Sequence, residues 1–330
     1  MSRVLLIGQG PTAATALQSL VDRCEVVGLV RRADPGDFVA RIAATATIPV
    51  FDDISMRGIE RLVAELQPDC VVVSSYDRIL GPALLARCPF VNVHYAPLPE
   101  YRGRATVNWA LINNESHVAI SIHELVPQLD GGQILFQEQV AIAADDTVAT
   151  LYERLNGLQR SKLGETVERF LGGEPGRVQD AARATYGCTR LPDDGHVDWA
   201  ATTQQIDGLI RGLVSPFPGA FTYLNGGRIV VWKAIPAPNA PSYVGRIPGR
   251  VVGVSKSEGW VDVLTGDGVL RLLEVHGHAG GPAAAATLIT SVKTTLGVRT
   301  VDLIARITVL EQHIADLTEM VARLGEGVTQ

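Results

Sequence analysis

Residues 4–30, VLLIGQGPTAATALQSLVDRCEVVGLV, alternate between apolar runs and a helical pattern. The run at 4–7 is short and uninterrupted, as is typical of a strand buried on both faces, and the run at 25–30 repeats it. Gly8 and Gly10 precede a helical pattern over 11–21. Two such strands joined by a helix predict a β-α-β unit, and therefore a parallel sheet.

The same alternation continues to about residue 170. Helices are expected at 38–44, 56–66, 106–112 and 147–170, and strands at 49–51, 70–73, 90–93, 118–123 and 134–140. This pattern predicts an α/β fold with a doubly wound, mostly parallel sheet that carries helices on both faces. We assign residues 1–180 to this first domain, and interpret the Gly- and Ala-rich stretch 172–187 as the linker that leads out of it.

The composition is that of a globular protein, with 330 residues, of which 46% are hydrophobic and 5% aromatic. This length is natural for two domains and a smaller appendage. The formal net charge of -6 gives no general attraction to phosphate backbones, so a nucleic-acid partner is disfavoured.

Two further classes of protein are disfavoured by the sequence. The 4 cysteines form no CxxC pair and have no histidine at ligand spacing, so neither a metal site nor a disulfide framework is expected. The N-terminus runs directly into a strand pattern, and no apolar run reaches the length of a membrane span. We therefore expect a cytoplasmic protein with no membrane partner.

From about residue 188 the pattern changes to short strands separated by turn residues. Residues 219–234, GAFTYLNGGRIVVWKA, predict a hairpin that turns at Asn225 and Gly226. Further short strands follow, so we expect residues 186–276 to form a small β-barrel of the OB-like kind. The Gly- and Ala-rich stretch 277–295 is expected to be a second linker.

Residues 296–325 show a hydrophobic repeat of seven residues. Its d positions are Leu296, Leu303, Leu310, Leu317 and Leu324, and its a positions include Ile307, Ile314 and Val321. β-Branched residues at a with leucine at d are typical of a parallel two-stranded coiled coil. We therefore predict a coiled-coil dimerisation helix and a homodimer. An amphipathic helix docked on its own domain is the alternative.

The N-terminal stretch IGQGPTAATAL, residues 7–17, also fits GxGxxA between a strand and a helix, and Arg31 and Arg32 end the next strand. This combination occurs in NADP-binding proteins, where the arginines hold a 2′-phosphate. Glycines at these positions also allow tight strand-to-helix packing in any doubly wound sheet. An NADP-dependent oxidoreductase therefore stays an alternative.

Polar residues end the strand expected at 90–93, in the stretch VNVHYAPLPEYRGRATVNW, residues 91–109. Asn92 and His94 occupy alternate positions and so share one face of the strand. Asp130 lies in the loop QLDGG between two later strands. A histidine supported by a carboxylate, beside an amide donor, suits attack of an amine on a carbonyl. The alternative is structural, with a histidine at a strand end and an ordinary Asp-Gly turn.

Six stretches, in order along most of residues 1–276, match one known family. They are YDRIL at 76–80, NVH at 92–94, LPEYRGRATVNWALINNE at 98–115, LDGG at 129–132, PDDGHVDW at 192–199 and SPFPGAFTYLNGGRIVVWKA at 215–234. With them the sequence resembles the folate-dependent formyltransferases, the family of methionyl-tRNA formyltransferase and the sugar N-formyltransferases. The heptad segment lies outside the match.

The resemblance implies a catalytic role for Asn92, His94 and Asp130, with 10-formyltetrahydrofolate as co-substrate and no metal. It implies that the pterin end of the folate is surrounded by Ile79, Leu80, Gly81, Arg104, Val126, Leu129 and Asp130. The version YRGRATVNW is closest to the enzymes that formylate UDP-4-amino-4-deoxy-arabinose, which implies that Arg102, Arg104 and Asn108 bind substrate. HYAPLP at 94–99 replaces the usual HPSLLP, which puts the geometry of the donor-side loop in doubt.

We therefore expect an enzyme that transfers a formyl group from 10-formyltetrahydrofolate to a primary amine, and rank a nucleotide-linked amino sugar first among acceptors. Methionyl-tRNA and a siderophore amine are alternative acceptors for the same chemistry. A non-catalytic dimeric scaffold is the alternative from another class, and the leucine repeat suggests it.

Overall fold

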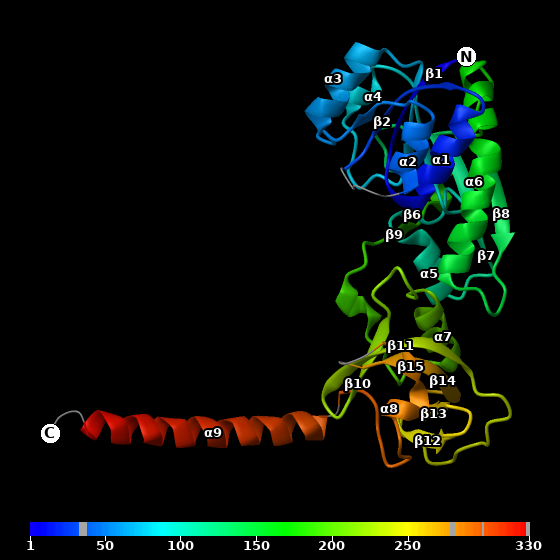
Figure 1. Cartoon of the computed structure of the whole chain (residues 1–330). Helices are drawn as coiled ribbons and strands as arrows, with labels where there is room; N and C mark the ends of the chain where they lie inside the picture. Colours follow the sequence, from blue (N-terminus) through cyan, green and yellow to red (C-terminus); the bar gives the residue numbers. More distant parts are fainter. Residues whose placement is uncertain (33–37, 278–280, 299, 328–330) are drawn as a thin grey trace. The chain divides into compact units, whose positions relative to one another are not determined.

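The computed structural model describes residues 1–32, 38–277, 281–298 and 300–327, with the side chains of the last helix described as far as Val321. The chain divides into two compact units, Met1–Pro192 and Asp193–Gln330 (Figure 1). Each unit contains a hydrophobic core of its own.

A seven-stranded sheet forms the centre of the first unit. Its strands are β1 (Arg3–Gly8), β2 (Glu25–Val30), β3 (Val50–Phe51), β4 (Cys70–Ser74), β5 (Phe90–His94), β7 (His117–Glu124) and β8 (Ile134–Ala141). They lie in the order β3-β2-β1-β4-β5-β7-β8. The strands from β3 to β5 pair in parallel, and β7 and β8 add antiparallel pairs at one edge. The prediction of an α/β fold with a mostly parallel sheet is confirmed.

Helices connect these strands. They are α1 (Gly10–Val21), α2 (Phe38–Thr45), α3 (Met56–Leu66), α4 (Pro82–Leu85), α5 (Thr106–Ile112) and α6 (Val148–Leu171). The chain runs from β1 outward to β3 and then crosses back to β4 beside β1. Because crossovers between parallel strands are right-handed, this reversal places α1 and α2 on one face of the sheet and α3 on the other. Leu5 of β1 accordingly packs with Ile59 of α3 in one buried cluster.

Local signals in the sequence explain where these helices begin. The Ser55 side chain accepts a hydrogen bond from the Gly58 N–H at 3.0 Å and so caps the first turn of α3. Thr147 and Thr150 form a capping box at the start of α6. The helices expected at 56–66 and 106–112 are observed with those bounds.

The prediction of a linker over 172–187 is wrong. β9 (Tyr186–Gly187) pairs in parallel with β6 (Arg102–Gly103), and Arg177 bonds with the first residue of β8. A Cβ on Gly103, whose φ is +96°, would lie 2.7 Å from the Gly187 carbonyl oxygen, so this close pairing requires glycine. The composition of the stretch is that of a loop, but its backbone bonds belong to the first unit.

An antiparallel sheet forms the second unit. Its strands are β10 (Ala220–Leu224), β11 (Gly227–Pro236), β12 (Val251–Val254), β13 (Val261–Leu264), β14 (Val269–His276) and β15 (Ala283–Ala284). They lie in the order β10-β11-β14-β13-β12 with β15 on β14, and α7 (Thr203–Arg211) packs on β11 and β14. The predicted hairpin is confirmed, because Asn225 and Gly226 connect β10 to β11 with φ of 51° and 82°. Closure of the sheet into a barrel stays a prediction.

The described part of 277–295 belongs to this unit and is not a linker, while residues 278–280 lie outside the described residues. β15 pairs with β14, and α8 (Ala285–Leu288) contributes Ala285 and Ala286 to the core of the unit. Leu296, expected as the first leucine of the coiled coil, is 2% exposed in the same core, and its N–H donates to the Gly249 carbonyl. The composition of this stretch is typical of a linker, but its small and apolar residues pack into the core of the second unit.

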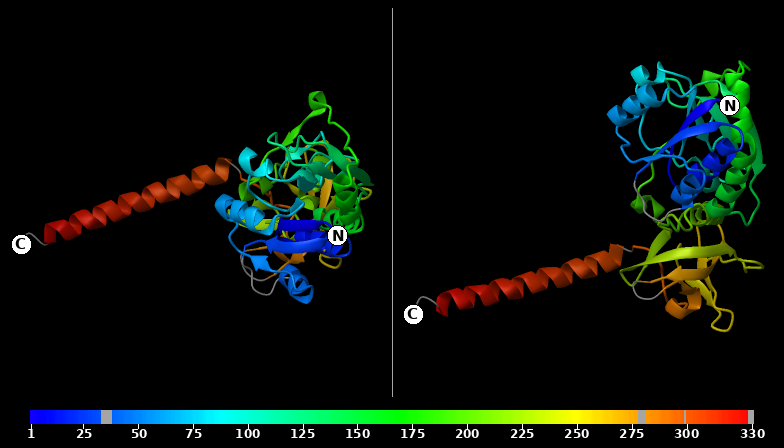
Figure 2. Two further views of the ribbon diagram at one scale, coloured as in Figure 1. Left: turned by 90° about the horizontal axis from the view of Figure 1, so that it is seen from above. Right: turned by 45° about the horizontal axis from the view of Figure 1, so that its top comes forward.

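α9 (Thr300–Gly327) is one unbroken helix (Figure 2). Its apolar side chains that fall on the heptad seam are exposed in the single chain, namely Leu303, Ile307, Leu310, Ile314, Leu317 and Val321. The side chain of Leu324 lies outside the described residues. The prediction of a C-terminal helix is confirmed, and its pairing with a second copy stays a prediction. Within the described ranges, no helix combines the length and the apolar character that a membrane span requires.

Candidate active site

Asn92 and His94 lie at the carboxyl end of β5, between β4 and β7. They line a cavity of about 540 Å³, together with the end of β4, the loop 75–80 and the loop 125–130. The strand period of two places both side chains on one face, as the sequence predicts. The carboxyl edge of a parallel sheet is where α/β proteins bind ligands.

Asp130 enters the same cavity from the loop between β7 and β8. The residue is buried, with 7% of its surface exposed. Its Oδ2 accepts a hydrogen bond from the Gly103 N–H at 2.8 Å. Its backbone has a φ of 46°, a left-handed conformation that is uncommon for residues other than glycine. The structure therefore brings Asn92, His94 and Asp130 together at one cavity.

The His94 ring is oriented by a backbone carbonyl. Its Nε2 lies 2.8 Å from the Tyr101 oxygen, which can only accept, so Nε2 carries the proton. The Asp130 Oδ2 lies 3.9 Å from the same nitrogen, which is too long for a hydrogen bond. The expectation that the carboxylate fixes the imidazole directly is thus modified, because Tyr101 fixes the tautomer and Asp130 contributes its charge.

His123 of β7 is a further member of the site that the sequence interpretation missed. It is fully buried, and its Nε2 lies 3.1 Å from the Asn92 Nδ2 and 3.6 Å from the Asp130 Oδ1. Its Nδ1 donates to the Glu124 carbonyl at 2.8 Å, so Nε2 accepts from Asn92. The signal available was the alternation of Ser121 and His123 within an otherwise apolar strand.

His123 stays neutral near neutral pH. Burial lowers its pKa from 6.5 to about 4, and the opposing charge of Asp130 does not cancel this effect. A neutral imidazole that accepts through Nε2 holds one of the Asn92 amide hydrogens. The Asn92 amide is therefore held in one orientation at the edge of the cavity.

This burial predicts a loss of stability in acid. Between about pH 6.5 and about pH 4 the unfolded chain binds a proton at His123 that the folded chain does not, so the free energy of unfolding falls as pH falls through that window. In His123→Gln this part of the pH dependence is expected to disappear, as measured by urea unfolding at about pH 7 and about pH 4.5. The matched control, His117→Gln at a partly exposed position of the same unit, should keep the wild-type dependence. An unchanged dependence in His123→Gln would contradict the assignment.

Most of the positions predicted to surround the folate line the cavity, and they are Ile79, Leu80, Arg104, Val126, Leu129 and Asp130. Gly81 does not line it and instead caps the start of α4. Ile79 is 79% exposed and Leu129 is 48% exposed, which leaves two large apolar side chains uncovered at the cavity. The Arg104 guanidinium donates to the Asp77 carbonyl at the same cavity.

Arg102 and Asn108, predicted to bind substrate, do not reach the cavity. Each is 1% exposed, and Arg102 donates to the Gln179 Oε1 at 2.7 Å and to the Tyr186 hydroxyl at 3.4 Å. Gly103, with its φ of +96°, breaks the strand alternation, so Arg102 is buried while Arg104 lines the cavity. Asn108 lies on the buried face of α5. The structure thus does not bring these two residues to the cavity, and their contact with substrate stays a prediction.

After His94, which lines the catalytic cavity, the remaining residues of HYAPLP are anchored elsewhere. The Tyr95 hydroxyl lies within hydrogen-bond distance of the Asn156 Oδ1 at 2.7 Å and of the Gln159 Oε1 at 3.0 Å, and both residues lie on α6. Tyr95, Ala96 and Pro97 line a second cavity, of about 640 Å³. The unusual residues of this loop therefore pack against α6 and the second cavity.

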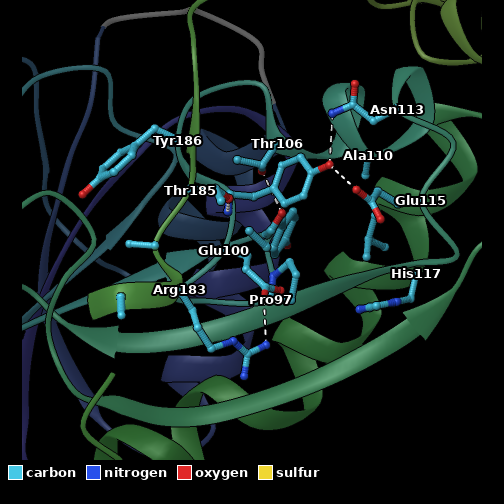
Figure 3. A pocket seen from close by; sticks show the side chains of 16 residues that line it. Pro97, Glu100, Thr106, Ala110, Asn113, Glu115, His117, Arg183, Thr185 and Tyr186 are labelled. Carbon is cyan, nitrogen blue, oxygen red and sulfur yellow. Dashed lines mark hydrogen bonds and ion pairs between the residues drawn. The ribbon is translucent and has the colours of Figure 1, made fainter. Parts of the chain in front are cut away.

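Figure 3 shows the second cavity, with Asn113 and Glu115 in its lining. Tyr101 also lines this cavity and connects it with His94. The Tyr101 hydroxyl donates to the Glu115 Oε1 at 2.5 Å and accepts from the Asn113 Nδ2 at 3.0 Å, while its carbonyl bonds with His94. Burial, with the Glu115 charge adding to it, raises the pKa of Tyr101 to about 12. Tyr101 is thus a neutral phenol, with its hydroxyl bonded to Glu115 and Asn113 and its carbonyl bonded to His94.

Comparison with known proteins identifies two matched domains. The formyl transferase family matches residues 12–167, and the formyl transferase C-terminal domain family matches residues 191–293. Among solved structures, an N-formyltransferase from Helicobacter canadensis in complex with folinic acid and dTDP-3-aminofucose is similar, with a TM-score of 0.62, 17% identity and coverage of 82% of this chain and 98% of that chain. WlaRD, a sugar 3N-formyl transferase, has a TM-score of 0.59, 15% identity and coverage of 85% and 99%.

HypX from Aquifex aeolicus, solved in complex with tetrahydrofolic acid, is also similar, with a TM-score of 0.61, 15% identity and coverage of 88% of this chain and 47% of that chain. The chain therefore spans about half the length of HypX. At these identities the solved structures support the fold.

The fold and the site define an α/β enzyme in which an amide, an imidazole and a carboxylate meet at one cavity. Because the two family matches together cover most of the sequence, the chain belongs to the formyltransferase family. The glycine motif at the N-terminus has a packing role, since a Cβ on Gly8 would lie 2.0 Å from the Ser74 carbonyl oxygen. Arg32 pairs with Asp77 at 3.0 Å, and both observations favour packing over a dinucleotide site. Among the described residues, no group of His, Cys, Asp and Glu side chains could hold a metal ion.

Proposed function

We propose that the protein transfers a formyl group from 10-formyltetrahydrofolate to the primary amine of a nucleotide-linked amino sugar. The observation that carries this proposal is the meeting of Asn92, His94 and Asp130 at one cavity of about 540 Å³. The exposed Ile79 and Leu129 at the same cavity support it, because the apolar faces of a pterin and its aromatic extension would cover them. Solved structures of the same fold contain tetrahydrofolic acid or folinic acid.

The proposed reaction begins with attack of the neutral amine on the formyl carbon. The new C–N bond gives a tetrahedral intermediate, whose oxyanion takes a hydrogen bond from the second amide hydrogen of Asn92. A donor of this kind stabilises the transition state by about 3 kcal/mol in other acyl transfers. His123 holds the first amide hydrogen at 3.1 Å and so aims the second.

Proton transfer is assigned to His94. Because Nε2 donates to the Tyr101 carbonyl, Nδ1 is the basic nitrogen of the ring. It takes the proton that the attacking amine loses and returns it to N10 of the folate as the C–N10 bond breaks. The products are a formamide and tetrahydrofolate. The Asp130 carboxylate, 3.9 Å from Nε2, stabilises the imidazolium that forms between these two steps.

The cavity is lined by two arginines as well as by the carboxylates of Asp77 and Asp130, and the arginines suit an anionic acceptor. Arg78 and Arg104 line it, and Arg32 lies beside them on Asp77. Guanidinium groups suit the diphosphate of a nucleotide sugar. The formal net charge of -6 does not favour the larger polyanion of a tRNA. The Helicobacter canadensis relative was solved with a dTDP-amino sugar, which supports the same class of acceptor.

Mass spectrometry of reaction products tests the proposal. The purified chain is incubated with 10-formyltetrahydrofolate and UDP-, GDP- and dTDP-linked amino sugars, beside methionyl-tRNA and a siderophore hydroxylamine or amine. Gain of one formyl group by a nucleotide sugar, with the nucleotide-linked N-acetyl sugar as inert control, is the expected result. Formylation of methionyl-tRNA or of the siderophore amine alone would replace the proposed acceptor. A chain that formylates nothing in the panel would contradict the proposal.

We infer further that α9 pairs with α9 of a second copy. The exposed seam holds leucine at d and β-branched residues at a, from Leu303 to Val321. At its flank Arg306 and Glu311 occupy g and e positions that face one another between parallel helices. In such a dimer the apolar side chains of the seam are buried against the seam of the second helix.

Replacement of Ile314 by aspartate is expected to convert the dimer to a monomer. The substitution places an unpaired carboxylate in the centre of the seam, where its burial is costly. Light scattering coupled to gel filtration measures the mass directly. Ala315→Asp is the matched control, because it adds the same charge one position away on the outer face of the helix and should remain dimeric. A dimer in Ile314→Asp would mean that the interface lies elsewhere. A monomeric wild type would mean that α9 forms no dimer.

A further inference from the structure

Gln179 makes three buried hydrogen bonds beneath the active site. Its Nε2 donates to the Asp130 carbonyl and to the Gly132 carbonyl, each at 2.7 Å. Its Oε1 accepts from the Arg102 Nη2, also at 2.7 Å. The residue is 9% exposed and lies in the stretch that sequence composition assigns to a linker. Neither cavity is lined by Gln179, so it does not touch substrate.

The orientation of the Gln179 amide is determined by its partners. Arginine has donors only, so the atom that faces Arg102 is the oxygen. The NH₂ group therefore faces two carbonyl oxygens, which can only accept. Reversal of the amide would oppose donor to donor on one side and acceptors to acceptors on the other.

The turn that Gln179 holds is one with an unfavourable backbone conformation. Asp130 has a φ of 46°, and such conformations persist where the surroundings fix them. The hydrogen bonds to Asp130 come from β6 and from the segment that precedes β9. Gly103 of β6 donates to the Asp130 Oδ2 at 2.8 Å, and Gln179, ahead of β9, donates to the Asp130 carbonyl. Side chain and main chain of Asp130 are therefore held separately.

Arg102 holds the Gln179 side chain in place by donating to its Oε1. It is 1% exposed, and its guanidinium donates to the Gln179 Oε1 and to the Tyr186 hydroxyl. Its charge acts on the site, since it contributes to lowering the pKa of His123 after the larger effect of burial. It reaches the Asp130 turn through the Gln179 amide, which links a buried cation to the backbone of the catalytic carboxylate.

We propose that Gln179 is a positioning residue for Asp130, which it keeps within reach of His94 and His123. The inference rests on the role of Asp130 in the proposed formyl transfer. Asp130 lies 3.9 Å from the His94 Nε2 and 3.6 Å from the His123 Nε2. A turn released by loss of the two Gln179 donors shifts the carboxylate relative to both rings. Displacement of a charged group by about 1 Å lowers rates by about 100-fold in other enzymes.

The test compares two variants of this residue with a matched control. Gln179→Met keeps the length of the side chain and removes all three bonds. Gln179→Glu keeps an acceptor for Arg102 and removes the two donors. Gln159→Met is the control, because Gln159 is also a buried glutamine of the first unit, bonded to Thr12, Thr15, Ser74 and Tyr95. Melting temperatures of all three report stability alone.

Two readouts separate positioning from stability. The first is the pH profile of kcat/KM in formyl transfer. The rate is expected to fall by about 10- to 100-fold in both Gln179 variants, and in the uncharged Gln179→Met the midpoint of the profile is expected to move to lower pH. Gln159→Met should lower the melting temperature and leave the midpoint unchanged. The second is NMR of ¹⁵N-histidine-labelled protein at constant pH, in which the His94 and His123 ring resonances are expected to change in the Gln179 variants and not in Gln159→Met.

Each outcome bears on the proposal. A Gln179→Met enzyme whose pH midpoint and histidine resonances match wild type would show that the residue serves stability only. Wild-type rates in Gln179→Glu would assign the effect to Arg102 and overturn the role of the two donors. If the wild-type chain formylates no acceptor, the proposed function fails, while the NMR comparison still decides whether Gln179 positions the turn.

Discussion

Replacement of His94 by glutamine is expected to lower the turnover of formyl transfer by about 100- to 10,000-fold, the range that loss of a general base commonly produces. Glutamine can still donate from its amide to the Tyr101 carbonyl, which His94 bonds at 2.8 Å, so the contact between β5 and its loop survives. It cannot take the proton of the attacking amine. Initial rates of formamide formation, measured by mass spectrometry with the acceptor that the panel identifies, check the expectation.

The control for His94→Gln is a histidine of the same unit outside the site. His117 lines the second cavity and bonds with the Ser116 hydroxyl, and His117→Gln should keep the wild-type rate within about twofold. Both variants should melt close to wild type. A near-normal rate in His94→Gln would remove the ring from the proton-transfer step, and the family relationship alone would then carry the assignment of the site.

The sequence predicted the layers of the first unit well because its apolar runs have the period of the elements they form. The strand at 70–73 and the helix at 56–66 show this directly, since β4 and α3 occupy those positions. The stretch 172–187 failed for a physical reason. Gln179 and Arg177 are polar residues among glycines and alanines, and their partners lie about 40 or more residues away, at Asp130, Arg102 and Ile134. Composition carries no record of such long-range hydrogen bonds.

The same distinction explains the site. Asn92 and His94 could be placed on one face from the strand period alone. His123 was missed because its partner, Asn92, is reached across the antiparallel register of β5 and β7, which the sequence does not specify. Arg102 does not reach the cavity because the left-handed φ of Gly103 breaks the strand alternation between the two arginines of RGR. Local period predicts which residues share a face, whereas register and left-handed turns decide which of them meet.

Replacement of Asp130 by asparagine is the second variant with a large expected effect, and it isolates the charge of the carboxylate. Asparagine tolerates the left-handed conformation at φ 46° better than most residues, so the turn should keep its shape. The side-chain oxygen can still accept from the Gly103 N–H, which now bonds Oδ2 at 2.8 Å. Folding and folate binding are therefore expected to change little, as melting temperature and a fluorescence titration with tetrahydrofolate would report.

The rate of Asp130→Asn is nevertheless expected to fall by about 100- to 1,000-fold, because a charge about 4 Å from an imidazolium contributes about 4 kcal/mol at an effective dielectric constant of about 20. The imidazolium of His94 forms while the amine proton is in transit, and the Asp130 charge 3.9 Å away stabilises it. His123 stays neutral in this variant. Burial is the largest cause of its lowered pKa, and loss of the Asp130 charge lowers that pKa further. A rate within about threefold of wild type would mean that Tyr101 alone, through its carbonyl at 2.8 Å, supports the histidine, and that the carboxylate has only the structural task of accepting from Gly103.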